Sequence, residues 1–240
     1  MESQAVEAKR QAVRKKPVRR GEARDRLLAA ARDKIIEQGL EGVSIRAINA
    51  AAGVSPGILH YHFGSLEELV LELLGRFMDP MMREREDLLR ALKAGGHSPT
   101  IREIAEILVM PVARLALEHG EDGYGHVCLL ARLYADRAPL LEEANMRWAS
   151  RFNSALFEQL QLANPELHDP EIALRLDLAG QVLLRGLSAL HQPPVPWLEQ
   201  RGVAAVEPWQ QVHVVVDFVA AGLGAAQAQP TGFHKPLSRF

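Results

Sequence analysis

The strongest chemical signal in this chain lies in residues 56–63, where several hydrogen-bonding side chains occur close together. Leu59 and Phe63 are four residues apart, so in a helix they would share one buried stripe. The other positions would then face outward with groups that suit the phosphates and base edges of DNA, since tyrosine and histidine can hydrogen-bond phosphate oxygens and glycine permits close approach. We therefore predict DNA contacts for Gly57, Ile58, His60, Tyr61 and His62.

Nine histidines also raise the question of a metal or catalytic site. His60 and His62 form the tightest pair, but side chains two apart on a helix do not face each other and cannot bind one ion. The chain contains no HExxH, phosphate-loop or Gly-x-Ser-x-Gly motif, and no Glu-x-x-His spacing of a helical-bundle oxidase. We therefore expect no cofactor, no metal and no catalysis, and a helical-bundle enzyme is the weakest alternative.

A helix is expected directly before this cluster. Ser44 suits its N-cap, because the hydroxyl can accept an otherwise unpaired amide hydrogen of the first turn. Apolar residues recur at helical spacing up to Ala52, which leaves Arg46 and Asn49 pointing away from the apolar face. Gly53 would end the helix in a left-handed conformation. Ser44 and Arg46 join the candidate DNA contacts.

The second helix is expected to begin with Ser55 as N-cap and Pro56 in its first turn. A turn as short as Gly-Val-Ser makes two helices cross steeply, as in a helix-turn-helix. Ser55 is therefore another candidate DNA contact. The alternative interpretation is a short connecting helix with incidental aromatic residues.

These features resemble the N-terminal domain of the TetR/AcrR family of bacterial transcriptional regulators. The resemblance covers residues 24–74, with Gly-Val-Ser at 53–55, GILHYHF at 57–63 and GSLEEL at 64–69. It implies a small inducer bound by a helical C-terminal domain and a dimer formed through the last two long helices, about 170–191 and 208–223.

Three residues depart from the pattern of that family. Ile58 stands where a small hydroxyl residue is common, and His60 where a tyrosine is common. Leu66 replaces a lysine that usually binds a DNA phosphate. These departures bear on individual DNA contacts and leave the resemblance in place.

The charge of the chain is unevenly divided. Residues 1–76 contain 13 Lys/Arg and 10 Asp/Glu, net +3, and the rest of the chain contains 15 and 20, net −5. We expect residues 1–22 to form a basic flexible arm. Arg19, Arg20 and Arg24 would then supply the positive charge that the lysine of the family usually brings to a DNA phosphate, or enter the minor groove.

The fold is expected to be all-α, because no segment shows the alternation of a strand. We expect Pro80 to bend or break a helix, residues 120–123 to separate two helices, and a single helix from Pro139 to about Ala163. The predicted domains are a helix-turn-helix DNA-binding domain at 23–74, a larger helical ligand-binding and dimerisation domain at 75–227, and a C-terminal tail at 228–240.

The composition is that expected of a cytoplasmic protein. No apolar run approaches the ~20 residues that a membrane span requires, and the charged N-terminus carries no secretory segment. Cys128 is the single cysteine, which excludes a disulfide framework and is consistent with a reducing compartment. We therefore expect no membrane partner.

Apolar and aromatic residues of the middle helices suggest a cavity. Trp148, Phe152 and Leu156 recur at four-residue steps, which is also the pattern of ordinary core packing. Pockets between helices are mostly apolar with a few polar groups, which His126, Tyr134 and Asn153 would supply. The predicted ligand-binding residues are Met110, His126, Leu130, Tyr134, Trp148, Phe152, Asn153, Leu156 and Leu187.

Together these observations predict a homodimeric, ligand-responsive transcriptional regulator. It would act as a repressor on a pseudo-palindromic, double-stranded DNA operator, from which a small, largely apolar effector would release it. The alternative is a ligand-independent architectural DNA-binding protein, which would have a filled core where the regulator has a pocket.

Overall fold

The computed structural model describes residues 20–193 and 196–226, and every regular element in these ranges is helical. The predicted all-α class is therefore confirmed. The chain divides into two compact units, one ending at Val70 and the other beginning at Leu71. This division lies close to the domain boundary predicted at residue 74. The arm up to residue 19 and the tail at 228–240 lie outside the described residues.

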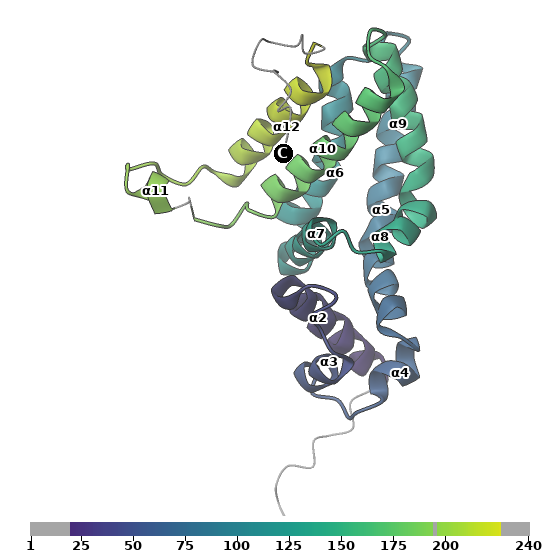
Figure 1. Cartoon of the computed structure of the whole chain (residues 1–240), viewed down its shortest axis with the longest axis vertical. Coiled ribbons are helices and arrows are strands. Elements are labelled where there is room, and N and C mark those ends of the chain that lie inside the picture. Colours follow the sequence, from purple (N-terminus) through teal and green to yellow (C-terminus); the bar gives the residue numbers. More distant parts are fainter. Residues whose placement is uncertain (1–19, 194–195, 227–240) are drawn as a thin grey trace, which may run out of the picture. The chain divides into compact units, whose positions relative to one another are not determined.

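The described part of the first unit contains the predicted pair of short helices joined by a turn (Figure 1). Its elements are α2 (Arg20–Gln38), α3 (Ile45–Ala51), α4 (Ile58–Phe63) and the first turn of α5 (Leu66–Ala94). Helices α2, α3 and α4 contact one another in every pairing. Their shared core is fully buried and includes Leu27, Ile35, Ile48 and Leu59.

Helix α2 begins earlier than predicted. Residues 20–22, expected in the flexible arm, form its first turn, and Arg24 also lies in the helix. Glu22 favours this earlier start, because it is an acidic residue in the first turn and pairs with Arg26 at 2.8 Å. The Arg24 guanidinium lies 5.0 Å from the ring centroid of Phe63, so Arg24 packs against the unit instead of extending from it.

The second unit holds the remainder of α5 and all later helices (Figure 1). These are α6 (Ile101–Glu118), α7 (Gly120–Ala135), α8 (Leu140–Ala144), the π-helical turn η1 (Asn145–Ala149), α9 (Ser150–Ala163), α10 (Asp169–Leu187), α11 (Pro196–Glu199) and α12 (Pro208–Gly224). Helix α6 packs against α7, α9, α10 and α12. Figure 1 shows α9 alongside α5, and an ion pair of 3.5 Å between Lys93 and Glu158 joins these two helices.

Three helix boundaries differ from the sequence-based expectation. Of the bend or break expected at Pro80, the break does not occur: Pro80 lies inside α5, where buried residues on both sides of the proline hold the helix in place. Residues 120–123 form the first turn of α7, so the expected break is confined to the junction at His119. The single helix expected after Pro139 is interrupted by the π-helical turn Asn145–Ala149.

A close backbone contact makes Gly123 essential to the packing of α7. A Cβ atom at this position would lie 2.1 Å from the backbone oxygen of Leu115 in α6, far inside van der Waals contact. We predict that Gly123→Ala destabilises the protein by about 1–3 kcal/mol. Gly180→Ala is the control, because a Cβ there meets nothing within 4 Å and alanine favours a helix by up to about 1 kcal/mol. Thermal unfolding should show the two melting temperatures moving in opposite directions.

Candidate DNA-binding and ligand-binding sites

The first helix of the candidate DNA-binding site begins as predicted. Ser44 is extended (φ −110°), and its Oγ accepts a hydrogen bond of 3.1 Å from the backbone N–H of Ala47. After the last turn of α3, Gly53 has a positive φ of 65°. The N–H of Val54 donates to the carbonyl of Asn49 at 3.0 Å, which satisfies a carbonyl of the last turn.

The second helix begins later than predicted. Ser55 and Pro56 lie in the turn, and α4 starts at Ile58 with Gly57 as its N-cap. Ser55 contributes its backbone carbonyl, which accepts from the N–H of Ile58 at 3.3 Å, so its expected role as N-cap is wrong. Gly57 has φ +91°, a conformation that other residues adopt only with strain. Gly57 therefore sets the direction of α4.

Asn49 joins the two helices, contrary to the expectation that it points outward. Its side chain is buried, with 4% of its surface exposed. The Oδ1 atom accepts from the N–H of Leu59 at 3.3 Å, and the Nδ2 group donates to the carbonyl of Ile45 at 3.0 Å. Because Leu59 lies in the first turn of α4, this side chain fixes that turn against α3.

The predicted DNA contacts fall into two groups by exposure. Tyr61 has 67% of its surface exposed, whereas Ile58 and His62 are half-buried. Tyr61 and His62 stack edge to face at 5.2 Å between ring centroids. The exposed predicted contacts are Ser44, Arg46, Ser55, Gly57, His60 and Tyr61.

His60 has restricted hydrogen-bonding chemistry. Its Nδ1 lies 2.7 Å from the carbonyl oxygen of Gly64, and a carbonyl can only accept, so Nδ1 carries the hydrogen. In the neutral ring, Nε2 is then an acceptor. In its neutral form His60 therefore suits a donor such as a base amino group better than a phosphate oxygen.

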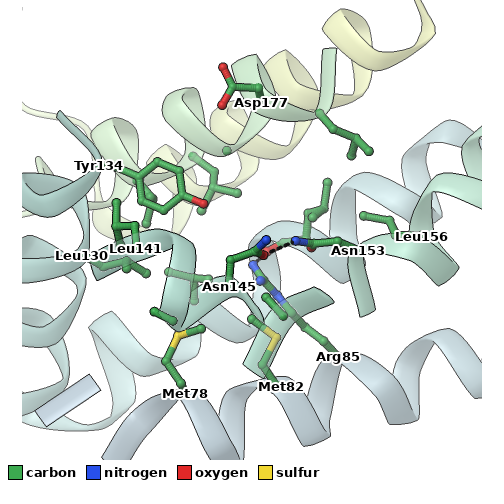
Figure 2. Close-up of a pocket in the computed structure, with 18 of the residues that line it drawn as sticks. Met78, Met82, Arg85, Leu130, Tyr134, Leu141, Asn145, Asn153, Leu156 and Asp177 are labelled. Atoms are coloured by element: carbon green, nitrogen blue, oxygen red, sulfur yellow. Dashed lines mark hydrogen bonds between the residues drawn. The ribbon is translucent and has the colours of Figure 1, made fainter. Parts of the chain in front are cut away.

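The second unit contains a cavity of about 690 Å³, within the range of small-molecule sites (Figure 2). Helices α5, α6, α7 and α10 and the segment from α8 to α9 contribute its walls. Most of the lining is apolar, including Leu74, Met78, Met81, Met82, Leu108, Val112, Leu130, Leu141, Leu156, Leu183 and Leu184.

Four of the predicted ligand-binding residues line this cavity: Leu130, Tyr134, Asn153 and Leu156. Tyr134 points into it from one side, and Asn153 lies on the opposite side (Figure 2). Burial raises the pKa of the Tyr134 phenol, so this group remains a neutral donor near pH 7.

The other five predicted residues lie elsewhere. Met110 lines a separate pocket together with His213, and the His126 ring stacks on Phe77 at 4.4 Å between centroids. Trp148 covers Gly75 of α5. The two remaining residues are core residues with almost no exposed surface: Phe152 and Leu187.

Sequence reasoning missed several polar residues of the cavity, among them Asn145 and Arg85. Asn145 belongs to η1, and its Oδ1 accepts from Asn153 Nδ2 at 2.8 Å. Arg85 lies in a strongly charged stretch of α5 that resembles an ordinary solvated face, yet only 7% of its surface is exposed. Burial lowers the pKa of the Arg85 guanidinium to about 10, with opposing effects from Tyr134 and Glu84. The available signal was that buried methionines and leucines recur at helical spacing before and after Arg85, at positions 78, 81, 82, 89 and 92.

The described residues contain neither a metal-binding cluster nor a membrane-spanning helix. Within residues 20–193 and 196–226, no group of His, Cys, Asp and Glu side chains has the arrangement of a metal site. No described helix combines the length and apolar character needed to cross a lipid bilayer.

Comparison with known proteins assigns both units to one family. Residues 27–73 match the sequence model of bacterial regulatory proteins of the tetR family. Residues 106–222 match the model of the tetracyclin repressor-like C-terminal domain. The chain belongs to the TetR family of transcriptional regulators. This membership makes it a regulator and not an enzyme, as the sequence predicted.

Individual relatives agree with this assignment over different lengths. The HTH-type transcriptional repressor KstR2 of Mycobacterium tuberculosis is 39% identical over 71 residues, which are 30% of this chain and 34% of that protein. KstR2 of Rhodococcus jostii is 35% identical over 66 residues, 28% of this chain and 32% of the relative. The chain thus spans about a third of the length of these curated relatives.

Solved structures extend the similarity in fold to most of the chain. Mycobacterium smegmatis AmtR has a TM-score of 0.52 at 18% identity, covering 91% of this chain and 92% of AmtR. The TetR family regulator PfmR of Thermus thermophilus has a TM-score of 0.50 at 18% identity, covering 86% and 98%. At these identities the likeness establishes the fold alone.

The bridge made by Asn49 gives a prediction for this regulator. Asn49→Ala would leave the buried N–H of Leu59 without its acceptor, which should destabilise the first unit by about 1–3 kcal/mol. Hydrogen exchange measured by NMR should show faster exchange of the Leu59 amide. Ala50→Gln at the exposed neighbouring position is the control and should leave this amide protected. Unchanged protection in Asn49→Ala would show that another group holds α4.

Proposed function

We propose that this TetR-family protein is a ligand-responsive repressor that binds its operator as a homodimer. The observation that carries the proposal is a mostly apolar cavity of about 690 Å³ in the unit that does not contain the helix-turn-helix. A ligand-independent architectural protein has no use for such a cavity and would be expected to fill it. The name of the KstR2 relatives supports repression, over the third of their length that is matched.

Helix α4 would enter the major groove, as the second helix of such units does. Its outward residues include Tyr61, whose phenol can hydrogen-bond a phosphate or base edge, and His60, whose neutral ring presents an acceptor. Arg46 of α3 would contact a phosphate or a base beside that groove. Two such helices in a dimer would read half-sites about 34 Å apart.

A dimer interface is proposed on α10 and α12, which pack against each other. Each helix exposes two large apolar side chains four residues apart: Leu174 and Leu178 at 58% and 50%, and Val214 and Phe218 at 57% and 64%. Exposed side chains at this spacing lie on one face of their helix. Apolar faces on two adjacent helices fit pairing with a second copy into a four-helix interface.

A ligand would release the protein from its operator if it binds two conformations of the protein with different affinity. A ligand that binds the cavity more tightly in a conformation unsuited to the operator shifts the population toward that conformation. The coupling in such systems is typically about 1–3 kcal/mol, or roughly 5- to 150-fold in operator affinity. No direct contact between ligand and DNA is required.

The DNA contacts are tested with an operator sequence that is first selected, from a pool of random DNA duplexes, by its binding to the wild-type protein. Tyr61→Ala should weaken binding to the enriched sequence by about 1–3 kcal/mol, as loss of a good base or phosphate contact does. Arg46→Ala should have a similar effect. Met146→Ala is the control, because Met146 lies in the second unit with 68% of its surface exposed, matching the 67% of Tyr61. Equal affinity of Tyr61→Ala and wild type, measured by fluorescence anisotropy, would exclude Tyr61 from the interface.

The dimer is tested by placing a charge on the exposed apolar face. Phe218→Glu should shift the equilibrium toward monomer by at least about 2 kcal/mol, since a central aromatic residue would be replaced by a carboxylate that must be desolvated. Leu162→Glu is matched to it, because Leu162 of α9 has the same exposure of 64%. Size-exclusion chromatography with light scattering should find Phe218→Glu monomeric at concentrations where Leu162→Glu and wild type are dimeric. A dimeric Phe218→Glu protein would place the interface elsewhere.

A further inference from the structure

Arg85 is a buried cation on the wall of the cavity. A guanidinium retains its charge at neutral pH even where burial lowers its pKa to about 10. Burying a charge is costly unless it is paired or fully hydrogen-bonded. The surroundings of Arg85 should therefore contain its partners.

Arg85 has only some of the hydrogen-bond and charge partners that a buried guanidinium needs. Arg85 Nη2 donates to the backbone carbonyl of Leu108 at 2.5 Å, and the guanidinium lies 5.4 Å from the ring centroid of Phe152. Its Nε atom is buried and has no hydrogen-bond partner among the described residues. The adjacent carboxylate of Glu84 is paired with Arg114. In the described part of the chain, Arg85 thus lacks a carboxylate of its own.

Further hydrogen-bond donors lie near Arg85. Figure 2 shows the guanidinium directed toward the Asn145–Asn153 pair, with the Tyr134 phenol pointing into the same cavity from another side. Because Asn145 Oδ1 already accepts from Asn153, the Asn145 amide hydrogens remain for a ligand. Asp177 lies apart from Arg85 in Figure 2, is exposed, and accepts a hydrogen bond from Gln181. Arg85 and these donors therefore give the wall of the cavity groups that suit an anion.

The rest of the wall suits an apolar molecule. Met78, Met81 and Met82 lie on the same helix as Arg85, and their flexible side chains can adapt to the shape of a ligand. Leucines of α7 and α10 line other parts of the cavity. Charge and apolar surface are therefore combined within a single cavity.

We propose that the ligand of this cavity is an amphipathic carboxylic acid, whose carboxylate binds Arg85 and whose apolar body lies among the methionines and leucines. The guanidinium can donate to the carboxylate, and Asn145 and Tyr134, from other parts of the wall, can donate to the remaining lone pairs. This inference rests on the proposed function in one respect: the acid that binds the cavity would also be the effector that releases the operator. The competing explanation is that Arg85 is structural and acts through Leu108 and Phe152 alone.

The test compares acids with neutral molecules of the same shape. A panel of straight-chain acids of eight to sixteen carbons and of arylalkanoic acids is titrated into the full-length wild-type protein by calorimetry, each beside its methyl ester and its alcohol, at concentrations below micelle formation. At least one acid should bind ten-fold or more tightly than both of its neutral counterparts. The preference should decline as pH falls through the ordinary carboxyl pKa of the acid. If every acid binds no better than its ester, or none binds, the inference is overturned.

Substitutions assign the preference to one residue. Arg85→Met should abolish the ten-fold preference while retaining the affinity for the neutral molecules, because it replaces the cation with a side chain like its neighbours. Arg83→Gln, two residues away on the same helix and exposed, should leave the preference unchanged. If Arg85→Met does not fold, Arg85→Lys retains the charge without the planar fork and should reduce the preference only in part. A preference that persists undiminished in Arg85→Met or in Arg85→Lys would contradict the assignment.

The same samples separate this inference from the proposed function. An acid that binds with the predicted preference but leaves operator affinity unchanged supports the ligand class and contradicts ligand-responsive repression. A neutral molecule that releases the operator while no acid is preferred supports repression and overturns the ligand class.

Discussion

Helix α6 packs against α7, α9, α10 and α12, and the shape of the second unit depends on that packing. Buried alanines allow the neighbouring helices to approach closely, with Ala105 and Ala113 having no exposed surface. The start of α6 is fixed by a capping box between Thr100 and Glu103. Hydrogen bonds from the Thr100 side chain and backbone lower the pKa of the Glu103 carboxyl to about 2, so the cap remains ionised near neutral pH. The cavity lies where the segment from α8 to α9 and helix α5 enclose space beside this packed centre.

Two buried polar side chains have contrasting surroundings. Asn49 uses both its oxygen and its amide group on backbone partners, and it thereby fixes α4 against α3. Arg85 is equally buried but leaves its Nε without a partner in the cavity wall. A buried polar group with all its hydrogen bonds made stabilises one arrangement of helices. A buried cation with missing hydrogen bonds instead favours binding of a ligand that supplies them. The first arrangement suits a rigid reading unit and the second suits a binding site.

The exposed surfaces of the two units also differ in chemistry. Hydrogen-bonding groups gather on α4, where Tyr61 is largely exposed, and apolar side chains gather on α10 and α12, where Leu178 and Phe218 are exposed. Arg175 of α10 donates to the carbonyl of Leu223 at 3.1 Å and so ties the end of α12 to α10. A hydrogen bond within one chain, from the Arg175 side chain to the backbone, therefore helps to hold α10 and α12 together.

The sequence by itself determined the all-helical class, some of the helix caps and the family. Ser44 and Gly53 could be recognised in the sequence because a cap involves residues no more than five apart. Only the tertiary structure decided which side of each helix is buried. The π-helical turn contains Trp148 and changes the helical register there, and of the expected stripe through Trp148, Phe152 and Leu156 only Leu156 lines the cavity. Asn49 and Arg85 likewise bond to residues 10 and 23 positions away, and only the packing of separate helices brings such groups together.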